Sequence, residues 1–167
     1  NLVKGFYLAR QRTGFQGKLV LVGEFYPKGH DVELVPTIRT LGLEQDVIFT
    51  GGVADDDLPA IFSGAIAKVF PSIHEGFGLA VIEAMACGTP VIAGRAGAVE
   101  EIVDSYGILL NQIDAESISD ALLLLIKDKE LRRELRKKGL DRSRNFSWQR
   151  AATQTLKVYE EVAQGVL

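Results

Sequence analysis

Short apolar runs typical of β-strands alternate with helical patterns along this sequence. The apolar runs occupy residues 18–23, 47–50, 67–70, 90–93 and 107–110. Strands separated by helices pair in parallel through right-handed crossovers, and helices cover both faces of such sheets. The sequence therefore predicts an α/β fold, a Rossmann-like open parallel sheet with helices on both faces. The run at residues 18–23 is expected to be buried on both sides.

Helical spacing and capping residues place helices between and after these strands. Helices are expected from near Leu2, over residues 33–41, from Leu58 behind the N-cap candidates Asp55, Asp56 and Asp57, over residues 78–88, around Glu101, over residues 115–127 and 129–139, and after the capping residue Ser147.

Composition is typical of one soluble domain spanning residues 1–167. The chain is 47% apolar and 25% charged, and its formal net charge of −3 carries no electrostatic footprint for nucleic acid. The longest aliphatic run, residues 121–126, is far shorter than the roughly 20 residues of a membrane-spanning helix. A single cysteine, Cys87, fits a reducing compartment, so the expected location is the cytoplasm. Cys87 is expected to pack behind the helix at residues 78–88.

A glycine-rich turn follows the strand at residues 67–70 and leads into a helix. Ligands of open parallel sheets bind at the carboxyl ends of the strands. Gly76 and Gly78 allow close backbone approach, and free amides near Phe77, Gly78 and Leu79 would face an anion such as a diphosphate. From the glycines alone, a turn that only solves a steric problem explains the pattern equally well.

Two glutamates sharpen this interpretation. Glu75 stands beside the expected anion site, where a carboxylate would accept hydrogen bonds from sugar hydroxyls. Glu83 interrupts an apolar helix and would be satisfied by a second set of hydroxyls, as on ribose, by turning outward to water, or by capping a neighbouring backbone amide. The common dinucleotide fingerprint is incomplete, since Val81 replaces its third glycine, and no Walker-type sequence occurs.

Residues 75–93 together resemble the signature of the group 1 glycosyltransferases, a retaining family of GT-B fold. That signature is E-G-F-G-L-x-x-x-E-A-M-A-x-G-x-P-V-I-A, and the likeness is to the C-terminal, donor-binding domain. Further similar positions follow in family order: residues 19–23, 47–51 and 70–72, Gly97 with residues 101–103, and residues 146–148 before Tyr159.

The resemblance implies a role for each matching residue. Glu75, the expected catalytic-site residue, would position the donor sugar through its hydroxyls, as part of a substrate site formed by Ser72, Glu75, Gly76, Phe77, Gly78 and Leu79. The diphosphate would lie near Ser72 and the amides of that turn, Glu83 would bind the ribose, and Gly51, Gly52 and Val53 would border the base. The donor would be a UDP- or GDP-sugar, with no cofactor and no obligatory metal.

The resemblance also implies parts that this chain lacks. In the family, a strand with an arginine and a lysine precedes the helix that here follows Asn1, and the strand is central in the sheet. A gap or exposed strand edges are therefore expected. The acceptor-binding N-terminal domain is absent, and membrane association would be possible only through that half. The chain alone is expected to bind nucleotide weakly and to transfer nothing.

Other interpretations and candidate residues remain. The rivals are a sugar-nucleotide epimerase, a phosphorylase, and a non-catalytic nucleotide-binding or assembly module of GT-B fold. His74 and His30 are expected to be loop residues, and with Cys87 they form no metal-ligand set.

Residues 127–138 are expected to form a solvated helix face, with a Glu134–Lys138 pair outside and Leu131 and Leu135 inside. The segment after Gly23, residues 24–27, departs from the family pattern.

Overall fold

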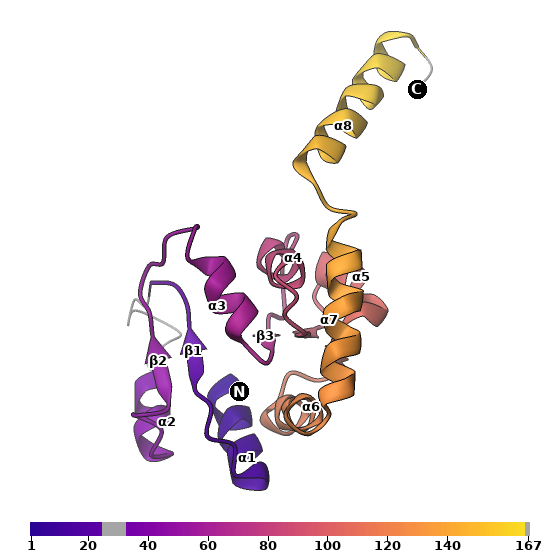
Figure 1. Ribbon diagram of the computed structural model, residues 1–167. Helices are drawn as coiled ribbons and strands as arrows, with labels where there is room; N and C mark the ends of the chain where they lie inside the picture. The colour runs from indigo at the N-terminus through magenta and orange to yellow at the C-terminus, as the bar shows by residue number, and fades with distance from the viewer. Residues whose placement is uncertain (25–32, 166–167) are drawn as a thin grey trace.

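The computed structural model describes residues 1–24 and 33–165 (Figure 1). In chain order the elements are α1 (Leu2–Thr13), β1 (Leu19–Leu21), α2 (Leu34–Thr40), β2 (Val47–Phe49), α3 (Leu58–Gly64), β3 (Lys68–Phe70), α4 (Leu79–Ala86), β4 (Val91–Gly94), α5 (Ala98–Val103), η2 (Asp104–Tyr106), β5 (Ile108–Leu110), α6 (Ala115–Lys127), α7 (Lys129–Ser143) and α8 (Trp148–Ala163). His30 and residues 25–27, on which two sequence predictions fall, lie outside the described residues.

All strand pairs between these elements are parallel, which confirms the predicted α/β class. β1 pairs with β2, and β3, β4 and β5 pair in that order. No pairing joins β1 to β3 within the described residues, so the strands form two sheets rather than one. The expected discontinuity in the middle of the sheet is therefore present.

The prediction that the first strand is buried on both sides is wrong. Leu19 and Leu21 pack into a core with residues of α1 and α2, but Val20 is 41% exposed. Ile48 of the paired strand β2 is 44% exposed, while its neighbour Val47 is buried. Side chains of a strand alternate between its two faces, so helices α1 and α2 cover only one face of this two-stranded sheet.

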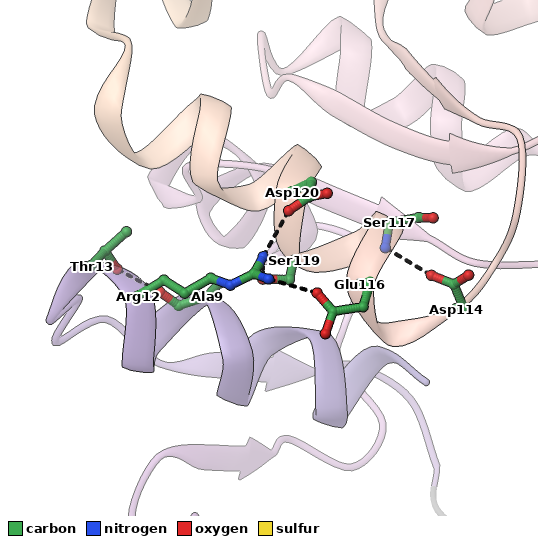
Figure 2. A network of polar contacts seen from close by, with 8 residues as sticks. All are labelled: Ala9, Arg12, Thr13, Asp114, Glu116, Ser117, Ser119 and Asp120. Atoms are coloured by element: carbon green, nitrogen blue, oxygen red, sulfur yellow. Dashed lines mark hydrogen bonds and ion pairs between the residues drawn. The ribbon is translucent and has the colours of Figure 1, made fainter.

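Helix α1 packs against both the two-stranded sheet and helix α6. Val3 and Phe6 belong to the core beneath β1 and β2, whereas Leu2 packs against the core that contains Ile118 of α6. Arg12 extends this contact with ion pairs to Glu116 and Asp120, both at 2.7 Å, as Figure 2 shows. Helix α1 thus connects the parts of the molecule that contain the two sheets.

One helix end and one helix cap differ from prediction for identifiable reasons. Helix α7 continues four residues beyond Gly139, because that glycine is buried against Met85 of α4 and brings the two helices together rather than ending one. Asp57 is the N-cap residue of α3, but its side chain accepts no hydrogen bond from the helix. Pro59 at the second position has no amide hydrogen, and the Ala60 amide donates to the Asp57 carbonyl instead.

Helix α8 projects away from the rest of the molecule (Figure 1). Ser147 caps it as predicted, since its hydroxyl accepts a hydrogen bond from the Arg150 amide at 3.2 Å. None of its residues is buried, and Trp148, Leu156 and Tyr159 are all exposed. Across the described residues, the model contains no helix with the length and apolarity needed to cross a membrane.

Candidate functional site

The glycine-rich turn lies where the chain leaves the carboxyl end of β3 and enters α4. The segment from the end of β4 to the start of α5 packs closely against it. A Cβ atom on Gly94, at the end of β4, would lie 2.8 Å from the Ser72 carbonyl oxygen. A Cβ atom on Gly97, before α5, would lie 3.0 Å from the Glu75 carbonyl oxygen. The absence of side chains at these glycines therefore lets the loops after β3 and β4 meet at one edge of the sheet.

Gly78, at the N-cap position of α4, has a conformation that favours glycine. Its φ of 96° is in the left-handed region, and a Cβ there would lie 2.7 Å from Cγ2 of the buried Val99. Glycine is required here because the turn must change direction while α4 begins directly against α5. This is the physical reason for the second glycine of the turn.

The amides around Gly78 are free. In the part of the chain that the structure describes, no acceptor receives a hydrogen bond from the backbone amides of Phe77, Gly78 or Leu79, and no side chain caps α4. The first amides of a helix carry partial positive charge and attract anions. The turn can therefore bind a phosphate or a carboxylate by backbone atoms alone.

The two glutamates of the sequence motif lie on either side of these amides along the chain. Glu75 is in the turn and Glu83 is in the second turn of α4, and both side chains are exposed. Neither carboxylate forms a hydrogen bond or ion pair within the described residues. Both are therefore open to hydroxyl groups of a ligand.

Lys68 is a charged residue near the site that sequence reasoning missed. It begins β3, and its ammonium group lies over the rings of Phe62, at 5.6 Å, and Phe70, at 5.9 Å. Burial lowers the pKa of Lys68 below its ordinary 10.5, and the nearby Glu83 carboxylate partly opposes that shift. The sequence signal was a lysine at a strand position where an apolar residue is expected.

The other candidate residues near the motif are Ser72, His74 and Cys87. The Ser72 hydroxyl donates to the His74 carbonyl at 2.8 Å, and the His74 side chain is exposed. Cys87 is partly buried against the core behind α4, as predicted. Burial raises the pKa of its thiol, and Glu83 adds to that shift. No group of three or more metal-binding side chains occurs among the described residues.

Gly51, Gly52 and Val53 follow the carboxyl end of β2, in the two-stranded sheet. Gly51 adopts a φ of 68° and its carbonyl accepts a hydrogen bond from the Gly23 amide at 3.1 Å. Gly51 is therefore paired with the segment after β1, whereas Ser72 and Glu75 follow β3 and Glu83 lies in α4.

A family model described as "Glycosyl transferases group 1" matches residues 2–142. Among curated relatives, the O-antigen chain mannosyltransferase B of Escherichia coli is 31% identical over 95% of this chain and 41% of its own length. An MMP alpha-(1->4)-mannosyltransferase of Mycolicibacterium hassiacum is 35% identical over 92% of this chain and 38% of its own length. The chain thus spans about two fifths of these relatives.

Solved structures match the fold over nearly the whole chain. Sucrose-phosphate synthase from Thermosynechococcus elongatus is 30% identical, with a TM-score of 0.84 over 98% of this chain and 42% of its own. The Anabaena protein HepE, solved in complex with UDP and glucose, is 26% identical, with a TM-score of 0.80 over 97% of this chain and 44% of its own.

Proposed function

The chain belongs to the group 1 glycosyltransferases and has the Rossmann-like architecture of GT-B enzymes, and we propose that it is the donor-binding domain of a retaining glycosyltransferase. The whole enzyme transfers a sugar from a nucleotide-sugar to an acceptor hydroxyl. Acceptor binding belongs to a further domain of the longer protein, so residues 1–167 bind the donor but do not turn it over.

This proposal rests mainly on the free amides of Phe77, Gly78 and Leu79. They are unpaired at the start of α4 and stand between two exposed carboxylates in the sequence. A nucleotide-sugar has the matching chemistry, with a diphosphate for the amides and a hydroxyl-bearing ring on each side of it. Solved relatives bind such compounds, since the Anabaena protein was crystallised with UDP and with UDP-glucose.

Each residue of the motif then binds or approaches one part of the donor. Glu75 accepts hydrogen bonds from the sugar hydroxyls and Glu83 from the ribose hydroxyls. Gly76 lets the backbone approach the sugar, and Ser72 lies near the diphosphate. Residues 51–53 border the base, across the gap between the two sheets.

Catalysis in the whole enzyme depends mainly on charge. The departing nucleoside diphosphate develops negative charge as the glycosidic bond breaks, and preoriented amides stabilise it without a metal ion. Glu75 holds the sugar in place and does not attack the anomeric carbon. Retention of configuration then requires the acceptor hydroxyl to bond to the anomeric carbon on the face that the nucleoside diphosphate leaves, and the departing diphosphate takes up the hydroxyl proton.

Isothermal titration calorimetry of the 167-residue chain with UDP, GDP, ADP and their glucose and mannose derivatives tests this proposal. We expect one nucleotide to bind with a Kd on the order of 0.1–1 mM. Glu83→Ala is expected to weaken binding at least tenfold, because hydrogen bonds to a charged group contribute roughly 1.5–3 kcal/mol. The matched control is Glu160→Ala on the exposed helix α8, which leaves the Kd unchanged.

Three results would contradict parts of the proposal. If Glu83→Ala retains full affinity, the ribose assignment is wrong. Sugar transfer by the isolated chain would overturn its inactivity. Binding of nucleotide with no preference for any sugar derivative would favour a non-catalytic nucleotide-binding module instead.

A further inference from the structure

Phe146 contacts the candidate site from a distant part of the chain. It lies in the short connection between α7 and α8, and its ring meets the ring of Phe77 in the turn. The ring centroids are 6.4 Å apart and the planes are inclined by 77°, an edge-to-face arrangement. The connection between α7 and α8 therefore contacts the turn at the residue between its two glycines.

Arg142 fixes the position of Phe146. Its guanidinium group donates hydrogen bonds to the carbonyl groups of Glu101, at 2.8 Å, and Ile102, at 3.1 Å. The same group lies over the rings of Tyr106, at 5.1 Å, and Phe146, at 5.0 Å. Phe146 is thus held against α5 and η2, beside the core that contains Ile102 and Val103.

The turn itself is not held by backbone hydrogen bonds of its own amides. Among the described residues, the amides from Ile73 to Phe77 donate to no backbone acceptor, and the Phe77 side chain is 48% exposed. Phe77 stands between Gly76 and Gly78, whose backbones have the widest conformational freedom. The packing of Gly78 against Val99 and of Gly97 against the Glu75 carbonyl holds the backbone on both sides of Phe77, and the ring contact holds the Phe77 side chain itself.

We propose that Phe146 is a positioning residue that holds Phe77 so that the amides of Phe77 and Gly78 face the donor diphosphate. The proposal rests on the proposed function of the turn. Phe146 touches no substrate and acts only through the Phe77 ring. An edge-to-face pair is strong enough to change ligand affinity by about three- to tenfold.

The test measures binding of two probes to the full chain by NMR titration. One probe is the nucleoside diphosphate that binds best by calorimetry, and the other is its nucleoside, which lacks the diphosphate. Phe146→Leu keeps an apolar side chain and removes the ring edge. We expect it to weaken diphosphate binding about three- to tenfold and to leave nucleoside binding unchanged.

Three further variants make the result specific. Phe146→Tyr retains the ring edge and is expected to restore wild-type affinity. Phe77→Leu removes the same contact from the exposed side, where it does not threaten folding, and is expected to give the same loss. The control is Phe15→Leu, a similarly half-buried ring in the core beneath β1 and β2, which leaves both affinities unchanged.

The outcomes separate this proposal from the proposed function. If the wild-type chain binds the diphosphate and Phe146→Leu binds it equally well, the positioning role is wrong and the donor site stands. Equal losses for both probes also overturn it, since they indicate general destabilisation. If the wild-type chain binds no nucleotide, the donor site is wrong. Amide hydrogen exchange of the ligand-free chain then decides: unchanged exchange rates at Phe77 and Gly78 in Phe146→Leu overturn the positioning role, and faster exchange there supports it.

Discussion

At the residue scale, the position of Gly78 requires both a left-handed backbone conformation and the absence of a side chain. Its φ is 96° and a Cβ would lie 2.7 Å from the Val99 side chain. We expect Gly78→Ala to lower the free energy of unfolding by about 2–3 kcal/mol, through backbone strain and overpacking together. Urea denaturation measures this. Gly76→Ala is the control, because nothing lies within 4 Å of its Cβ and its φ is not positive; an equal loss there would refute the steric explanation.

Lys68 makes the free energy of unfolding change with pH in the alkaline range. Its pKa in the folded state is below the ordinary 10.5, chiefly because of burial. The folded state therefore binds this proton less tightly than the unfolded chain, and stability increases as pH rises through the folded pKa toward 10.5. We expect Lys68→Met to raise the free energy of unfolding at pH 7 by about 1 kcal/mol. That gain should shrink as the pH approaches 10.5.

Denaturation curves at several pH values check this expectation. Lys137→Met, at an exposed lysine of α7, is the control and should change stability by less than about 0.5 kcal/mol. A destabilised Lys68→Met protein at pH 7 would mean that the contacts of the ammonium group with Phe62 and Phe70 outweigh the cost of burying it.

At the scale of elements, α7 and α8 are consecutive helices with opposite surroundings. Leu135 of α7 is 5% exposed, whereas Leu156 of α8 is 57% exposed. We expect Leu135→Ala to cost about 2–5 kcal/mol by opening a cavity. Leu156→Ala should cost less than about 0.5 kcal/mol. Guanidinium unfolding of both variants measures the difference, and a large loss from Leu156→Ala would show that α8 packs against the body of the isolated chain.

Elements also show which parts of the fold can be predicted from sequence. Strands and helices with clear periodicity were placed correctly, and the Glu75-to-Glu83 motif identified the turn at the end of β3. Gly139 was misjudged, because a glycine that ends a helix and one that packs against Met85 look alike in a sequence. Phe146 could not be linked to Phe77, since nothing local pairs two residues so far apart. Burial of Val20 was overestimated, because the sequence does not show which sheet face lacks a helix.

At the scale of the whole molecule, the contact between α1 and α6 holds the two sheets in one body. A Cβ atom on Gly5 would lie 2.6 Å from Cγ2 of Ile118 and 3.0 Å from the Ala115 carbonyl oxygen. We expect Gly5→Ala to force these helices apart and to cost about 1–3 kcal/mol. The control is Gly64→Ala, where nothing lies within 4 Å. Thermal unfolding should remain a single transition for the control and become broader or biphasic for Gly5→Ala; a sharp, unshifted transition would contradict the role of this contact.

The separation of β1 from β3 has a consequence for concentrated solutions of the chain. A strand edge without a neighbour is a template for a strand of another molecule, and inward-pointing charges discourage such pairing. β3 carries such a charge, because Lys68 lies over Phe62 and Phe70. β1 consists of Leu19, Val20 and Leu21 and carries none. β2, Val47–Phe49, is the other strand of this two-stranded sheet and also carries no charge. Aggregation on concentrating the chain should therefore begin at the sheet of β1 and β2, and a lysine introduced at Val20 would be the direct way to improve its solubility.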